Sequence, residues 1–203
     1  RRGRHDDAGE HYRRSEQAYS GYWLIDDHAA ELLAARGRLE EAAVLYERVI
    51  DRVPRPELQH ALGDLYTLMG ERELARDAHD RALAGYLAST RRGGVHYYHH
   101  LADFYADVRE NGAEAVKWAH LDVDLRRNPA TEAALAWALH RNGQPSEALD
   151  LMTRALSSGV RDAHLFSRAG RIHLVLGRLG EAERYLGMAA DMNPRHESFH
   201  VHR

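Results

Sequence analysis

The sequence contains no cysteine and no long apolar run. The absence of cysteine excludes disulfides, cysteine-ligated zinc sites, thiol nucleophiles and iron–sulfur clusters. No apolar stretch approaches the roughly 18 residues that a membrane-spanning helix requires, so membrane insertion is not expected. These absences leave the compartment open, with the cytoplasm as the favoured location.

Neither sign of charge dominates the chain. Its 203 residues include 28 basic and 31 acidic side chains, which give a formal charge of −3 when the histidines are neutral. No basic surface for nucleic acid or for an anionic membrane is therefore expected. Protonation of all 15 histidines would add 15 charges and change the net charge from −3 to +12, so the charge should depend steeply on pH between about 5 and 7.

Motifs for catalysis are also missing. Gly93 and Gly94 are followed by Val-His rather than by the Lys-Ser of a phosphate-binding loop, and no Gly-x-Ser-x-Gly motif occurs. Nothing in the sequence pairs two carboxylates in a pocket. We therefore expect no enzymatic activity and no cofactor.

Residues that favour helices are abundant, with 31 alanines and 25 leucines, and they predict an all-α fold. A repeat is visible when six segments are aligned on one alanine each, at spacings of 33 or 34 residues with one spacing of 40. The aligned positions are Ala8, Ala42, Ala75, Ala115, Ala148 and Ala182. Side chains four and seven positions after each alanine share one helix face, and a second helix precedes most of these segments.

Small residues mark the contact between the two helices and the turn that joins them. Gly stands five positions before the aligned alanine in four repeats, and Pro54, Pro129 and Pro194 follow second helices. Together with Leu62-Gly63-x-x-Tyr66, Gly70 and Ala75, this pattern resembles the tetratricopeptide repeat, although Gln59 stands where the family has Trp. The segment around Trp137 is similar to bacterial multi-repeat proteins of unassigned function. The resemblance implies a right-handed α-solenoid.

The spacing predicts that residues 1–203 form a single solenoid. Its expected parts are the second helix of a truncated repeat at 1–20, repeats at 21–54, 55–94, 95–129, 130–161 and 162–194, and the start of a further helix at 195–203. The spacing of 40 places an insertion around 83–94, where the second helix should be extended.

The resemblance implies that the first helices line a concave groove that binds a protein or peptide. Helical spacing predicts eight lining residues: His60, Asp64, His99, Asp103, Trp137, Arg141, Arg168 and Arg171. Acidic residues and histidine occupy the earlier repeats, whereas Trp and Arg occupy the later ones. A partner segment that is basic at one end and acidic or apolar at the other suits this order.

Two histidine patterns suggest metal binding as an alternative, although no metal is expected in the protein. His96, His99, His100 and Asp103 are spaced to share one helix face, which suits a metal- or pH-responsive regulatory segment of a larger protein. The segment His196–His200 matches the zinc peptidase pattern, which we interpret as chance at a chain end.

A third hypothesis concerns assembly. Tyr19, Tyr22 and Trp23 cluster at the start of the first complete repeat, where the truncated repeat leaves an open end. Exposed aromatic side chains at such an end would drive self-association.

Overall fold

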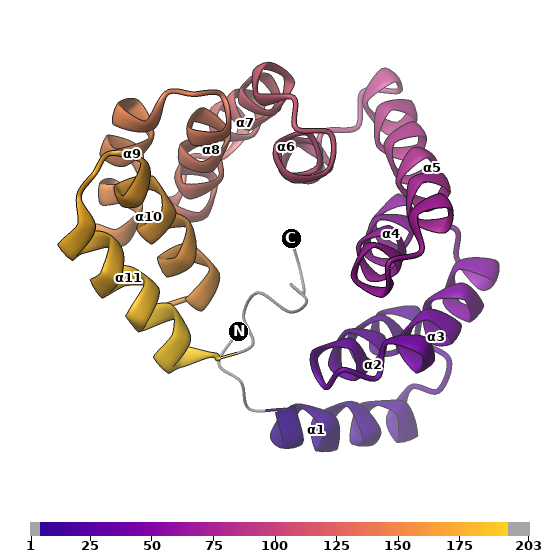
Figure 1. The fold of residues 1–203 in the computed structure, drawn as a ribbon. Coiled ribbons are helices and arrows are strands. Elements are labelled where there is room, and N and C mark those ends of the chain that lie inside the picture. Colours follow the sequence, from indigo (N-terminus) through magenta and orange to yellow (C-terminus); the bar gives the residue numbers. More distant parts are fainter. Residues whose placement is uncertain (1–4, 195–203) are drawn as a thin grey trace. The chain divides into compact units, whose positions relative to one another are not determined.

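The computed structural model describes residues 5–194 (Figure 1). These residues form eleven α-helices and one short π-helical segment, and no strand occurs among them. The prediction of an all-α fold is confirmed. Within this range no helix combines the length and apolar character needed to cross a membrane. The chain divides between Ala88 and Ser89 into two compact units.

The first unit is built from the helices before this division. They are α1 (His5–Ala18), α2 (Trp23–Ala35), α3 (Leu39–Arg52), α4 (Pro56–Met69) and most of α5 (Arg72–Arg91). Helix α2 packs against α1 and α3, and α3 also packs against α4. Ala30, Ala42, Tyr46 and Leu58 are fully buried. Alanines at these positions allow the helix axes to approach closely around the larger side chains.

The second unit contains the remaining helices. They are α6 (Tyr98–Asp103), the π segment η1 (Phe104–Val108), α7 (Gly112–Leu125), α8 (Pro129–Arg141), α9 (Pro145–Ser157), α10 (Ala163–Val175) and α11 (Leu179–Met192). Helix α8 packs against α7 and α9, α10 packs against α11, and α6 contacts both α7 and α8. Leu101, Phe104, Met152 and Ile172 are fully buried in its core.

Most turns between paired helices use glycine as expected. Gly70 and Gly143 have φ values of 81° and 78°, in the left-handed region that glycine adopts without steric cost. The turn before α7 lacks this glycine and differs. There Arg109 N donates to Phe104 O in a π-type hydrogen bond of 3.0 Å, and Glu110 takes a φ of 49°. Asn111 then caps α7 by accepting from Glu114 N.

The sequence extension around residues 83–94 is helical in its first part. Helix α5 has 20 residues and continues to Arg91 before the turn at Gly93 and Gly94. Alanine and leucine in this stretch favour a helix, and Gly85, which lies against Pro56 of α4, does not interrupt it.

Candidate functional site

A buried ion-pair network links three elements of the second unit. Arg168 on α10 donates from Nη2 to Asp103 Oδ1 at 2.7 Å and to Asp107 Oδ2 at 3.3 Å. Asp103 ends α6 and Asp107 lies in η1, four residues later on the same face. Two carboxylates around one guanidinium offset the cost of removing these charges from water.

Trp137 on α8 completes this group. Its indole Nε1 donates to Asp107 Oδ1 at 2.9 Å, and the Arg168 guanidinium lies 5.1 Å from its ring centroid, within range of a cation–π interaction. Asp103, Asp107, Trp137 and Arg168 are named here the Arg168 network. Its directional hydrogen bonds and ion pairs add to the apolar packing that holds α6, η1, α8 and α10 together.

Cationic side chains lie beside this network on α8 and α10. Arg141 donates from Nε to Ala106 O and from Nη2 to Glu110 Oε1, both at 2.8 Å. The His140 ring stacks on Trp137 with centroids 4.9 Å apart. Burial lowers the pKa of His140, and the positive charges of Arg141 and Arg171 lower this pKa further. Arg141, Arg171 and the neutral His140 are therefore close neighbours.

The four-residue histidine face predicted on α6 is not assembled as a ligand set. Asp103 binds Arg168, His99 Nδ1 lies 3.1 Å from Arg126 Nη2, and the His96 ring lies 4.0 Å from that of Tyr97. Burial lowers the pKa of His99, so its cationic form is disfavoured. The groups of possible metal ligands within residues 5–194 lie elsewhere, in the first unit.

One of these groups is an acidic cluster on α2, consisting of Asp27, His28 and Glu31. Asp27 and Glu31 are 8% and 5% exposed, and His28 Nδ1 lies 3.1 Å from Glu31 Oε2. Burial and then the nearby Glu31 charge raise the pKa of Asp27 to about 7. Hydrogen bonding to Glu31 raises the pKa of His28. This arrangement favours a proton on the cluster, with His28 and Glu31 paired.

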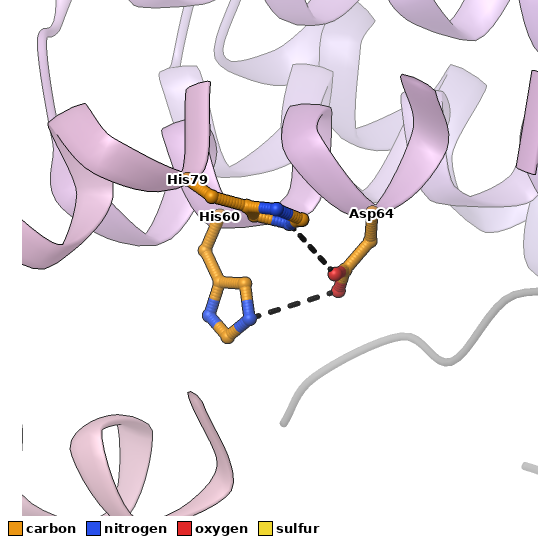
Figure 2. A group of neighbouring side chains, drawn as sticks. All are labelled: His60, Asp64 and His79. Atoms are coloured by element: carbon orange, nitrogen blue, oxygen red, sulfur yellow. Dashed lines mark hydrogen bonds and ion pairs between the residues drawn. The ribbon is translucent and has the colours of Figure 1, made fainter. Parts of the chain in front are cut away.

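The other group joins α4 to α5 and is shown in Figure 2. His60 and Asp64 are four residues apart on α4, and His79 reaches them from α5. His79 Nε2 lies 3.1 Å from Asp64 Oδ1, and His60 Nε2 lies 3.8 Å from Asp64 Oδ2. The three side chains converge on one point within the first unit. They are named here the His60 cluster.

The eight residues predicted to line a groove have different environments. His60, Asp103, Trp137 and Arg168 are buried, Asp64 and His99 are half-buried, and Arg141 and Arg171 are exposed. The structure brings Asp103, Trp137 and Arg168 together, and it places His60 beside Asp64. Contact with a partner through all eight residues stays a prediction.

Sequence reasoning missed two members of these clusters. Asp107 was recognisable only as an acidic residue four positions after Asp103. His79 lies four positions after Ala75, on the helix face that the repeat pattern assigns to packing. The signal for its role is Gly63, because a Cβ at this position would lie 2.3 Å from His79 Cδ2. Glycine therefore admits the imidazole ring against α4.

Two other predicted features are the aromatic cluster at residues 19–23 and the peptidase-like pattern at 196–200. Tyr19 and Tyr22 are 73% and 49% exposed, whereas Trp23 is half-buried beneath the Arg55 guanidinium at 4.5 Å. The segment 196–200 with its peptidase-like pattern lies outside the described residues.

Comparison with known proteins identifies the repeat. Residues 130–163, which cover all but the first residue of α8 and all of α9, match the family model described as tetratricopeptide repeat. These residues form a tetratricopeptide-type repeat. A search of curated proteins gives no match to the sequence.

Solved structures extend the likeness over most of the chain. TTC0263, a thermophilic tetratricopeptide repeat protein in Thermus thermophilus, is 18% identical with a TM-score of 0.59, over 85% of this chain and 92% of that one. PilW, a widely conserved type IV pilus biogenesis factor, is 15% identical with a TM-score of 0.58, over 91% of this chain and 80% of that one. These likenesses confirm the predicted helical-repeat solenoid class. Tetratricopeptide folds are typically non-catalytic scaffolds for protein–protein interaction.

Proposed function

We propose that this chain is a non-enzymatic scaffold that holds an acidic partner segment on the α8 and α10 side of its second unit. Arg141 and Arg171 supply the binding charges, and Trp137 supports them from beneath. Binding uses a surface that is already formed, so the scaffold loses little conformational entropy on association.

The observation that carries this proposal is the convergence of two cations from different helices. The positive charges of Arg141 from α8 and Arg171 from α10 both lower the pKa of His140. Arg171 is exposed, and the Arg141 side chain is 30% exposed. A carboxylate arriving from a partner can therefore approach both guanidinium groups, and two charge-assisted hydrogen bonds would also set its orientation.

The Arg168 network supports this surface. It is buried and holds α8 and α10 through Trp137 and Arg168. Arg141 is also anchored to the backbone at Ala106, with Glu110 beside it. Side chains held in this way are preorganised, which limits the entropy lost when a ligand binds.

In the first unit, we propose that the acidic side chains attract a basic part of the partner. Asp64 supports this reading because its side chain is 18% exposed and remains an acceptor. His60 is buried beside it. The two units are thus proposed to select opposite charges, each on its own surface.

Replacement of Arg171 by Ala tests the proposal. Fluorescence anisotropy first identifies acidic peptides that bind the unaltered full chain. The affinity of these peptides for Arg171→Ala is then measured in the same way. Loss of one charge-assisted contact should weaken binding about 10-fold or more while the melting temperature stays unchanged. Arg161→Ala, at an exposed position in the loop before α10, is the matched control for removal of a positive charge.

Equal weakening by Arg171→Ala and Arg161→Ala would show that binding follows net charge alone and would contradict the proposed site. Trp137 is unsuitable for this test because it is only 6% exposed. Its truncation to Ala would create a cavity and destabilise the unit by about 3–5 kcal/mol.

A further inference from the structure

The scaffold function uses the charge of Asp64 but does not explain why two histidines converge on it in the His60 cluster. The cluster brings two imidazoles and one carboxylate together from two helices of the first unit (Figure 2). His60 and His79 are 3% and 7% exposed, so both rings are removed from bulk water. A scaffold surface does not require this combination of side chains in its interior.

We propose that His60, Asp64 and His79 form a binding site for a zinc-class divalent transition metal ion. His60 and His79 each supply an imidazole nitrogen, and Asp64 supplies a carboxylate oxygen. Two histidines and one carboxylate are a common three-residue donor set for zinc, and the fourth position then takes water or a group from another molecule.

Distances between the donor atoms fit a metal of this size. Zinc bonds to nitrogen and oxygen of about 2.0–2.2 Å in tetrahedral geometry place neighbouring ligand atoms about 3.3–3.6 Å apart. The separations from the Asp64 oxygens are 3.1 Å to His79 Nε2 and 3.8 Å to His60 Nε2. All three donor atoms lie within 4.8 Å of one another. Side-chain adjustments of a few tenths of an ångström would complete the geometry.

A supporting contact orients His60. Its Nδ1 lies 3.2 Å from the hydroxyl oxygen of Tyr86, a fully buried residue of α5. In the metal-bound form Nδ1–H donates to this oxygen, which leaves the Nε2 lone pair directed toward Asp64. Hydrogen bonds of this kind to the second ring nitrogen are typical of metal-ligating histidines.

Helix α4 has a glycine, Gly63, at the point where the His79 ring packs against it. The ring of His79 occupies the space that a Cβ at residue 63 would take, with a closest approach of 2.3 Å to Cδ2 and 2.6 Å to Nε2. Glycine at 63 therefore permits the imidazole to reach Asp64. The His79 ring also lies edge-on to that of His60, with centroids 5.9 Å apart.

Access to the site is through Asp64. Its side chain is 18% exposed, compared with 4% and 9% for the side chains of His60 and His79. The open coordination position would lie on this side.

The test is a titration of the full chain with zinc chloride after treatment with a chelator. Because the chain has 15 histidines, the reference protein carries His196→Gln, His200→Gln and His202→Gln to remove ligands near the chain end. Isothermal titration calorimetry should show one saturable zinc site, and the melting temperature should rise with zinc. Asp64→Asn should weaken this site at least tenfold, and Tyr86→Phe should weaken it about 10–100-fold.

His99→Gln/His100→Gln is the matched control, because it removes two histidines from the second unit and should leave the isotherm unchanged. An isotherm that is the same in Asp64→Asn, or one lost in the His99→Gln/His100→Gln control, would overturn the proposal. Absence of saturable binding in the reference protein would also overturn it and would identify the cluster as a hydrogen-bonded packing contact.

A crystallographic measurement on the reference protein, in which the His60 cluster is unaltered, does not depend on whether the variants fold. Crystals of the reference protein grown with zinc should give an anomalous peak at the zinc edge about 2.0–2.2 Å from His60, His79 and Asp64. A peak on other histidines without one at this position would contradict the assignment.

Discussion

Asp27 is the single residue whose protonation is coupled most clearly to folding. Its pKa of about 7 in the folded chain compares with about 3.9 for an unfolded aspartate. The folded state therefore holds a proton that the unfolded state releases. This contribution to stability is complete below about pH 4 and is lost as the pH rises through about 7.

Asp27→Asn should remove this pH dependence. At pH 4 Asp27 is protonated in the folded state and about half protonated in the unfolded state, and asparagine resembles the protonated form, so the two proteins should have similar unfolding free energies. At pH 8 the variant should be more stable by about 2 kcal/mol, because wild type then carries a poorly solvated charge beside Glu31. Urea unfolding at both pH values measures the difference.

Asp51→Asn removes a carboxylate at an exposed position and controls for net charge. A stability gain at pH 8 that is equal in both variants would contradict the assignment to Asp27.

Residue identity alone could not predict which charged side chains are buried. Asp103 and Arg168 were expected to face a groove, yet their side chains are 11% and 8% exposed and bind each other. Helical spacing gives the direction of each side chain from its own axis. It does not give the rotation of α6 toward α10, which determines this ion pair.

At the scale of elements, the turn between η1 and α7 departs most from the repeat pattern. The other helix-pair turns could be predicted because glycine at a fixed position specifies a left-handed residue. Here Glu110 takes that conformation with a side chain, and the π-type hydrogen bond of Arg109 accommodates the change. The missing glycine marks this turn as different, but a π segment has no sequence signature that could have revealed it.

Glu110→Gly should stabilise the second unit. A left-handed conformation costs a residue with a Cβ about 1–2 kcal/mol. The substitution also removes the exposed ion pair with Arg141, worth about 0–1 kcal/mol, so a net gain of about 0.5–1 kcal/mol is expected. Chemical denaturation measures this gain.

Glu110→Ala separates the two effects, because it loses the ion pair and keeps the Cβ. It should be no more stable than wild type. A gain as large as that of Glu110→Gly would show that backbone strain is not the cause.

At the scale of the whole molecule, the repeat was predictable because its determinants are local. Helix periodicity, small packing residues and turn glycines lie within about 34 residues of one another. The division into units at Ala88 and Ser89 was not predicted. It falls within a continuous helix, where no change in composition marks a boundary, and the repeat limits derived from spacing stay predictions.

Self-association through the first unit is a property of the whole chain that we expect to depend on Tyr19 and Tyr22. Both side chains are well exposed, and burial of aromatic area between two copies would stabilise a dimer. Light scattering should show a mean mass that rises above 23.1 kDa with concentration, and Tyr19→Ser/Tyr22→Ser should remain at the mass of one chain.

Leu174→Ser/Val175→Ser removes two exposed apolar side chains from the second unit and is the control. The hypothesis fails when the unaltered chain keeps the mass of a monomer at every concentration, or when only the control prevents association.

The Arg168 network also bears on how the second unit folds over time. Arg168 and Asp103 are 65 positions apart, whereas most packing joins helices that are adjacent in the chain, such as α8 with α9 and α10 with α11. Local contacts form quickly, and a contact that closes a long loop forms after them. An interaction absent from the transition state slows unfolding without accelerating folding. We therefore expect this ion pair to lengthen the lifetime of the folded unit without changing the speed at which it forms.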